Sequence, residues 1–190
     1  STQIHARGVP NDEMAELANV NEPDLVAGLA RAYVEAGARV LTTNTFGANR
    51  FNLRRHAPKR SVAEVNRAGV ELSRRGARDA DVLIVGSIGP SGKLLAVKET
   101  EESELAASFA EQAKALAEGG AQVLVLETFS ELAEILLALR TVKEATGLPV
   151  VASMSFDAGP QRTRTMMGAQ AGECAAALED AGADAIGTNC

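Results

Sequence analysis

The hydrophobic and polar positions of this chain follow two alternating patterns. Long stretches have apolar residues at the three- and four-residue spacing of an amphipathic helix, and short continuous runs of Val, Leu and Ile follow them. Such continuous runs are typical of strands that are buried on both faces. The patterns predict helices at residues 21–37, 61–77, 104–120, 130–147 and 172–182, and strands at residues 39–45, 81–88, 122–128, 148–156 and 184–190.

One unit of this pattern occurs three times. The stretches EAGARVLTTNTF, EGGAQVLVLETF and EDAGADAIGTNC each run from a helix end through a Gly-Ala pair into an apolar strand with a polar tip. Glycine is the usual left-handed stop after a helix, so the stretches are aligned on Gly37, Gly120 and Gly182. Their polar ends then coincide in two rows, which are Asn44, Glu127 and Asn189, followed by Thr45, Thr128 and Cys190.

The alternation of helices and strands predicts a parallel sheet. The functional site of such folds lies at the carboxyl ends of the strands, where Asn44, Glu127 and Cys190 fall. Five strands in 190 residues fit either an open doubly wound sheet or an incomplete barrel, because a closed barrel of eight units needs about 250 residues. Residues 46–60 predict a polar connection with about one helical turn, and residues 89–103 predict a long loop at the site.

Composition narrows the class of partner. The chain is 46% hydrophobic and 23% charged, which is enough to bury one sizeable core, and its net charge is −6. An acidic protein is a poor match for a nucleic acid or an anionic membrane, so we expect a small-molecule ligand. The apolar runs are too short for a membrane span, and the amino terminus has no signal-peptide core. We therefore expect a cytoplasmic protein, while the oligomeric state has no signal in the sequence.

The two cysteines are too few for a disulfide framework. Cys174 lies among alanines in a predicted helix and is expected to be a buried, inert thiol. Cys190 ends the chain at a strand tip, and Ser1 begins it without a methionine. We therefore expect residues 1–190 to be a single domain that is truncated at both ends.

Five motifs in series give the chain a family resemblance. TTNTFGANR, GSIGPSG, LETFSE, VASMSF and GADAIGTNC resemble, in order and spacing, the homocysteine S-methyltransferase domain, the zinc-dependent barrel of cobalamin-dependent methionine synthase and of betaine–homocysteine methyltransferase. The resemblance extends from about Ile4 to Cys190. It implies an α/β fold, a parallel (β/α) TIM-type barrel that is incomplete here, with about five of eight strands and without the first and last strands.

The resemblance also implies roles for individual residues. Cys190 closes the NC motif and corresponds to one of three thiolate ligands of zinc. The other two belong to a Gly-Gly-Cys-Cys motif that this chain does not contain. Glu127 corresponds to the acidic residue that binds the homocysteine amino group, and Thr43, with Asn44 beside it, falls in the amino-acid pocket. An Asp-Gly motif that also helps to bind homocysteine in the family is absent from this sequence.

These roles agree with elementary chemistry. A free thiol with a pKa of about 8.5 is mostly protonated at neutral pH, and zinc bound by three thiolates with one open position takes up a substrate sulfur as the thiolate. Structural alternatives exist for each residue. Glu127 can cap the helix that follows it, Cys190 can be a buried or unpaired thiol, and Thr43 and Asn44 can satisfy backbone groups at a strand tip.

The implied reaction is the transfer of a methyl group to the zinc-activated thiolate of homocysteine, giving methionine. Family donors are betaine, S-methylmethionine and methyl-cobalamin charged from methyltetrahydrofolate, in which case cobalamin is held by a separate domain or partner. One alternative is a catalytically inactive α/β fragment or small-molecule binding module. Another is a barrel lyase or aldolase, which usually needs a Lys or several acids at strand ends, whereas the strand tips here offer only Glu127.

Overall fold

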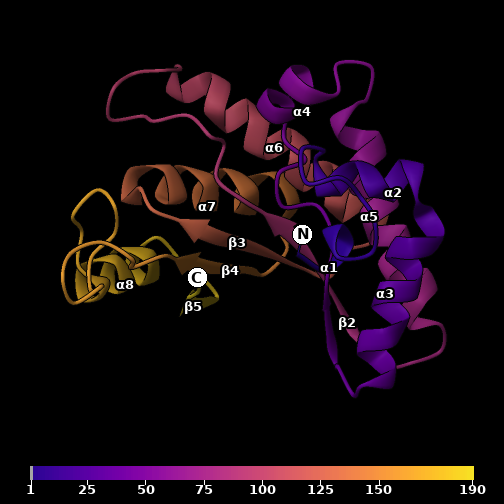
Figure 1. Ribbon diagram of the computed structural model, residues 1–190. Helices are drawn as coiled ribbons and strands as arrows, with labels where there is room; N and C mark the ends of the chain where they lie inside the picture. Colours follow the sequence, from indigo (N-terminus) through magenta and orange to yellow (C-terminus); the bar gives the residue numbers. More distant parts are fainter. Residues whose placement is uncertain (1) are drawn as a thin grey trace.

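The computed structural model describes residues 2–190 as one α/β body with five parallel strands (Figure 1). The strands are β1 (Val40–Thr42), β2 (Leu83–Ile88), β3 (Val123–Phe129), β4 (Val150–Met154) and β5 (Ala185–Thr188). The α-helices are α1 (Thr2–His5), α2 (Ala18–Asn21), α3 (Pro23–Glu35), α4 (Arg50–His56), α5 (Val62–Ala77), α6 (Glu102–Gly119), α7 (Leu132–Thr146) and α8 (Ala171–Asp180), and a 3-10 turn, Ala15–Leu17, precedes α2.

The order of the strands selects between the two folds that five strands allow. The strands lie side by side in chain order, β1-β2-β3-β4-β5, and every neighbouring pair is parallel. A doubly wound sheet reverses direction at a switch point, whereas a barrel adds each strand on the same side of the last one. The sheet is therefore an open segment of a barrel, as predicted.

The repeated unit has the same backbone geometry in all three copies. Gly37, Gly120 and Gly182 have φ angles of 95°, 95° and 83°, in the left-handed region that glycine adopts at low cost. The alanine after each glycine donates its N–H to a carbonyl five residues earlier, in pairs Ala38–Tyr33, Ala121–Leu116 and Ala183–Leu178. Each turn therefore closes a helix and releases the chain directly into a strand.

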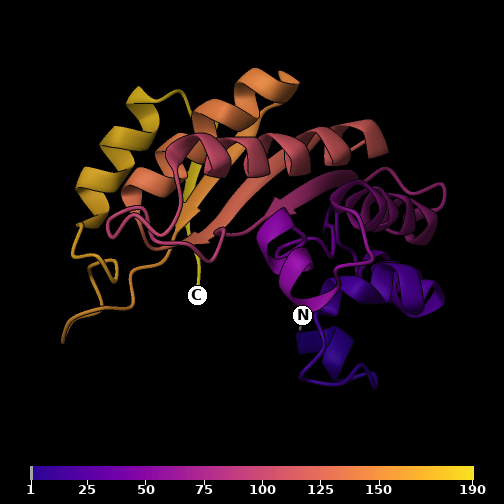
Figure 2. The same cartoon turned by 90° about the horizontal axis from the view of Figure 1, so that it is seen from above.

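Helices α5 to α8 cover one face of the sheet. Seen from above, α6, α7 and α8 lie along one side of the strands, and both chain ends lie on the other side (Figure 2). Helix α5 packs between α3 and α6, and α6 packs on α7, which is the ring-like succession of a barrel. The concave face is thus left for the site.

Burial on both faces, which the apolar runs predict for every strand, is wrong for the two edge strands. Val40 in β1 is 53% exposed and Ile186 in β5 is 41% exposed, and every residue of β5 is exposed. Strands β2, β3 and β4 are largely buried because each has a neighbour on both sides and helices on its outer face. The position of a strand in the sheet, rather than its apolar composition, therefore decides how deeply it is buried.

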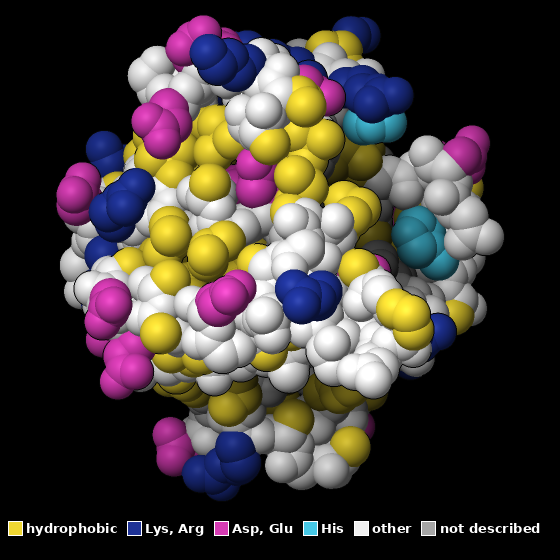
Figure 3. All heavy atoms as spheres, turned by 90° about the vertical axis from the view of Figure 1, so that its left-hand side faces the viewer, with side chains coloured by type: hydrophobic (Ala, Val, Ile, Leu, Met, Phe, Trp, Pro, Cys, Tyr) yellow, Lys and Arg dark blue, Asp and Glu magenta, His cyan; other side chains and the backbone are white. Residues whose placement is uncertain are grey.

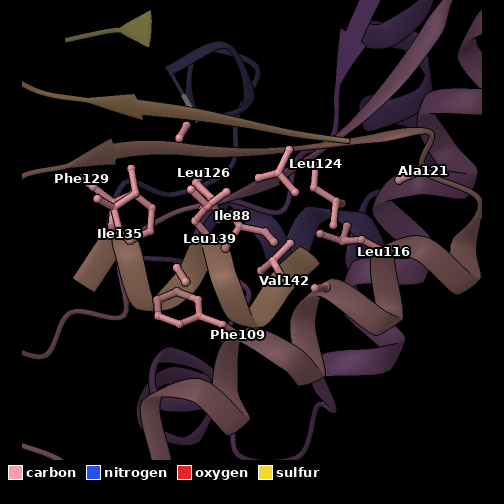
Figure 4. Close-up of a cluster of buried hydrophobic side chains, with 14 of the residues drawn as sticks. Ile88, Phe109, Leu116, Ala121, Leu124, Leu126, Phe129, Ile135, Leu139 and Val142 are labelled. Atoms are coloured by element: carbon pink, nitrogen blue, oxygen red, sulfur yellow. The ribbon is translucent and has the colours of Figure 1, made fainter. Parts of the chain in front are cut away.

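The main core lies between the strands and the helices outside them. Side chains of β2 and β3 meet those of α6 and α7 there, as Figure 4 shows for Leu124, Leu126 and Phe129 facing Phe109 and Leu139. These residues are at most 1% exposed, and the rings of Phe109 and Phe129 are 6.1 Å apart at a tilt of 41°. Burial of these large side chains is the main stabilising term of the fold.

The loop at residues 89–101 has no regular structure, as predicted, but it is held by two buried carboxylates. The Oε1 atom of Glu134 accepts hydrogen bonds from the N–H of Ser91 at 2.8 Å and from its Oγ at 2.5 Å. Glu131 accepts the N–H groups of Leu95 and Ala96 at 3.1 and 2.9 Å. Burial, with a smaller contribution from the negative charge of Glu131, raises the pKa of Glu134, and the Ser91 bonds oppose this rise.

The connection at residues 46–60 contains more helix than predicted. Helix α4 spans seven residues, Arg50–His56, because the side chain of Asn49 accepts the N–H groups of Phe51 and Asn52, both at 3.0 Å, and so caps its first turn. This cap anchors the segment directly after the first polar strand tip.

The outer surface carries charges of both signs. On the face shown in Figure 3, acidic and basic side chains alternate around apolar ones, and no continuous basic patch forms there. Among the described residues, no helix is long and apolar enough to cross a membrane.

Truncation of Leu124 tests the core. Leu124→Ala removes a fully buried side chain and leaves a cavity, so it is expected to lower the free energy of unfolding by about 2–5 kcal/mol. Urea unfolding of the full-length protein measures the change. Val97→Ala is the control, because Val97 is 64% exposed and its truncation is expected to have little effect. Equal losses in the two variants would contradict the assigned core.

Substitution of Glu134 tests the loop anchor. The pKa of Glu134 is higher in the folded state than its ordinary value of 4.5, so protonation of this carboxyl group stabilises the folded state at low pH. This stabilisation is lost as the pH rises from 4.5 through the folded-state pKa. Glu134→Gln keeps an acceptor for Ser91 without the buried charge. We expect a higher melting temperature than the unchanged protein at neutral pH and a difference that shrinks on acidification. Glu179→Gln is the control, because Glu179 is exposed. If the gain in melting temperature of Glu134→Gln grew on acidification, the raised pKa of Glu134 would be refuted.

Candidate functional site

A cavity of about 740 Å³ opens at the carboxyl ends of β1, β2 and β3. It extends down the β1 edge along α3, where Val26, Leu29 and Tyr33 form an apolar wall. The four residues singled out in the sequence all line it, namely Thr43, Asn44, Glu127 and Cys190. The fold therefore brings together strand tips that are far apart in the sequence, as the repeat predicted.

Glu127 enters the cavity from the end of β3. Its Oε1 atom accepts a hydrogen bond from Ser87 Oγ at 2.6 Å, and within residues 2–190 its other carboxylate oxygen forms no hydrogen bond. Helix α7 begins at Leu132, and no side-chain bond caps it. The alternative that Glu127 caps this helix is therefore wrong, and one of its oxygens is available to a ligand.

A buried chain of hydroxyl groups supports Glu127. Thr45 Oγ1 donates to the carbonyl of Ser87 at 2.8 Å and lies 2.6 Å from Thr43 Oγ1. Thr43 Oγ1 in turn accepts the N–H of Ser87 at 3.1 Å. Thr43, Thr45 and Ser87 are at most 4% exposed, so these bonds lock the tip of β1 to the tip of β2.

The side chain of Asn44 bonds to the amino-terminal segment. Its Nδ2 donates to the carbonyl of Ala15 at 2.7 Å and to Asn19 Oδ1 at 3.1 Å, while Asn19 Nδ2 donates to the carbonyl of Asn44 at 2.8 Å. The alternative that Thr43 and Asn44 satisfy backbone groups is thus correct for both side chains. They contribute to the cavity as walls that are fixed in place.

The two cysteines differ in their surroundings. Cys174 is 1% exposed in α8, and burial raises the pKa of its thiol, which agrees with the predicted inert role. Cys190 is exposed at the rim of the cavity, with its Sγ 4.0 Å from Thr128 Oγ1 and 3.6 Å from Asn189 Nδ2. Of the alternatives for Cys190, the buried thiol is therefore wrong.

A single thiol does not make a zinc site. Within residues 2–190, no three His, Cys, Asp or Glu side chains gather into a metal-binding group. Cys190 is nevertheless of the correct chemical type for zinc, and its exposure at the cavity rim leaves its sulfur accessible. The described residues can thus supply one thiolate ligand at this position.

Several functional neighbours have weak signals in the sequence. Ser87 lies in the GSIGPSG motif, at the end of the strand predicted at residues 81–88. Asn189 belongs to the first row of aligned strand-tip residues and Thr128 to the second. Glu16 has no signal at all, yet it is 7% exposed, lines the cavity and accepts the N–H of Gly47 at 2.7 Å. Its partner lies 31 positions further along the chain, which no local pattern reveals.

Comparisons with known proteins agree with this geometry. The chain is 31% identical over 206 residues to methionine synthase of Mycobacterium tuberculosis, covering 100% of this chain and 17% of that protein. It is 33% identical over 175 residues to betaine–homocysteine S-methyltransferase 1 of Danio rerio, covering 91% and 42%. The crystal structure of oxidised homocysteine methyltransferase MmuM from Escherichia coli superposes with a TM-score of 0.81 at 24% identity, covering 100% and 70%, and so shares the fold.

The chain thus spans less than half the length of these two curated relatives. A sequence profile of the homocysteine S-methyltransferase family matches residues 1–190, which is the whole chain. The match agrees with the sequential parallel strands and with the strand tips that meet at the cavity. The chain belongs to the homocysteine S-methyltransferase family.

Proposed function

We propose that the protein containing this chain transfers a methyl group to the sulfur of homocysteine and releases methionine. One observation carries the proposal: a single cavity is lined by a carboxylate with a free oxygen, Glu127, and by an accessible thiol, Cys190, in a chain of this family. Homocysteine carries an ammonium group on its α-carbon and a thiol at the end of its short side chain. Glu127 is complementary in charge to the ammonium group, and the Cys190 thiol is of the type that binds the same metal as a substrate thiol.

Glu127 binds the substrate ammonium group in this proposal. A carboxylate and an ammonium group form a charge-assisted hydrogen bond, which is stronger than a neutral one and gains further strength where solvent is limited. Ser87 occupies one carboxylate oxygen, so the other is directed to the ligand. Thr43 and Asn44 line the same pocket and limit its volume without adding charge.

Cys190 supplies one of the zinc ligands in this proposal. The remaining two thiolates would come from the Gly-Gly-Cys-Cys motif of the family, which lies outside this chain. Zinc, when bound, acts as a Lewis acid that keeps a substrate sulfur deprotonated at neutral pH. The part played by this chain is to hold the amino-acid end of homocysteine, so that its sulfur stays beside Cys190 while the methyl group is transferred.

The donor is one of the classes that the family uses, which are betaine, S-methylmethionine and methyl-cobalamin with its own separate domain or partner. A cytoplasmic location is part of the proposal, because zinc thiolates require reduced cysteines. Both cysteines of this chain are free, which is consistent with that compartment. Assays with each donor in turn identify the class.

Replacement of the carboxylate tests the ammonium contact. Glu127→Gln is isosteric but uncharged, and it is expected to weaken homocysteine binding about 10- to 100-fold, because a hydrogen bond to a charged group contributes roughly 1.5–3 kcal/mol. Zinc content is expected to stay unchanged. Calorimetric titration of the full-length protein measures the affinity, and Glu179→Gln on the outside of α8 is the matched control. Unchanged affinity would remove Glu127 from the pocket.

Replacement of the thiol tests the metal role. Cys190→Ser in the full-length protein is expected to lose both bound zinc and methionine formation, since serine is a poor zinc ligand. Metal analysis and a methyl-transfer assay measure the two losses. Cys174→Ala is the control and is expected to keep both. A Cys190→Ser protein that retained either property would rule out Cys190 as a ligand.

A further inference from the structure

The backbone of Thr128 is in an unusual conformation. Its φ angle is 64°, in the left-handed region that a β-branched residue rarely adopts because its side chain crowds the backbone. Thr128 directly follows Glu127 at the end of β3, in the wall of the cavity. Strain of this kind persists only where the surrounding contacts impose it.

The strain coincides with a bulge in the sheet. Leu126 pairs with Ala152 and Phe129 pairs with Met154, so two residues of β3, Glu127 and Thr128, lie opposite a single residue of β4, Ser153. A bulge leaves the extra residue without a ladder partner and re-aims the side chains beside it. Here the re-aimed side chain is the carboxylate of Glu127, which reaches Ser87 Oγ at 2.6 Å.

Asn189 supplies the contacts that the ladder does not. It follows β5 and reaches across β4, where its Oδ1 accepts the N–H of Thr128 at 3.1 Å and the Oγ of Ser153 at 2.8 Å. Its Nδ2 donates to Thr128 Oγ1 at 2.7 Å. Its own backbone is fixed by Met154 and Ser155, through bonds of 3.3 and 3.1 Å. The side-chain amide therefore forms two hydrogen bonds with Thr128, one to its backbone N–H and one to its hydroxyl group.

We propose that Asn189 is a positioning residue for Glu127: its amide holds Thr128 in the left-handed conformation that directs the Glu127 carboxylate into the cavity. Without these two hydrogen bonds, Thr128 relaxes to a negative φ angle, and the peptide group between Glu127 and Thr128 rotates. Glu127 then loses Ser87 and the orientation that an ammonium ligand needs. This inference rests on the proposed function for the identity of the ligand, and on geometry alone for the rest.

A glycine rescue separates this role from a merely structural one. Asn189→Ala in the full-length protein is expected to weaken homocysteine binding about tenfold, the effect of losing roughly 1.4 kcal/mol, with zinc retained. Adding Thr128→Gly is expected to restore most of the affinity, because glycine adopts a positive φ without help. Adding Thr128→Ala instead is the matched control and is expected to restore nothing, since alanine keeps the crowding.

Crystal structures of the same variants test the geometry independently of any ligand. In Asn189→Ala, we expect residue 128 to have a negative φ angle and the hydrogen bond between Glu127 and Ser87 to be broken. When Thr128→Gly is added, we expect the positive φ angle and this hydrogen bond to return. The inference would be overturned if Thr128 kept a positive φ angle in Asn189→Ala. It would also be overturned if Thr128→Ala restored homocysteine affinity as well as Thr128→Gly does, or if Asn189→Ala lost zinc and Thr128→Gly did not restore it. Failure of the unchanged protein to bind homocysteine would overturn the proposed function, and the crystal structures would still decide the inference.

Discussion

The left-handed glycine turn that ends a helix and starts the next strand sets the level of the strand tips in this protein. Gly37, Gly120 and Gly182 each close a helix with the same backbone hydrogen bond, and each tip lies seven positions later. Since neighbouring strands are parallel, equal spacing from equivalent turns brings the tips to one edge of the sheet. The cavity is a consequence of this spacing.

The three equivalent tip residues then serve different purposes. Asn44 bonds to the amino-terminal segment, Glu127 faces the cavity, and Asn189 reaches across β4 to the bulge in β3. Their neighbours explain the difference. Asn44 has the 3-10 turn and α2 beside it, Glu127 has Ser87 at the tip of β2, and Asn189 has Ser153 and the bulge in β3. One repeated fragment thus yields two groups that bond to neighbouring segments and one group that faces the cavity.

The polar groups of the site are held by backbone and hydroxyl partners rather than by mobile loops. Buried hydroxyl groups connect β1 to β2 and β2 to Glu127. The strained Thr128 is held by a hydrogen bond from Asn189, which reaches it across β4. A carboxylate fixed in this way needs little reorganisation when a charged ligand arrives. The loop at residues 89–101, next to these tips, is itself anchored by Glu131 and Glu134, so the surroundings of the site are fixed as well.

The sequence by itself determined the parallel α/β class, the five strands, the helix stops and the set of strand-tip residues that line the cavity, because these depend on periodicity, glycine turns and local spacing. Strand order, the exposure of β1 and β5, the anchoring of Glu127 by Ser87 and the approach of Glu16 and Asn189 were decided only by the tertiary structure. Each of these depends on which segments become neighbours. Hydrogen bonds between residues 31 to 61 positions apart, such as that from Thr128 to Asn189, leave no periodic trace in the chain.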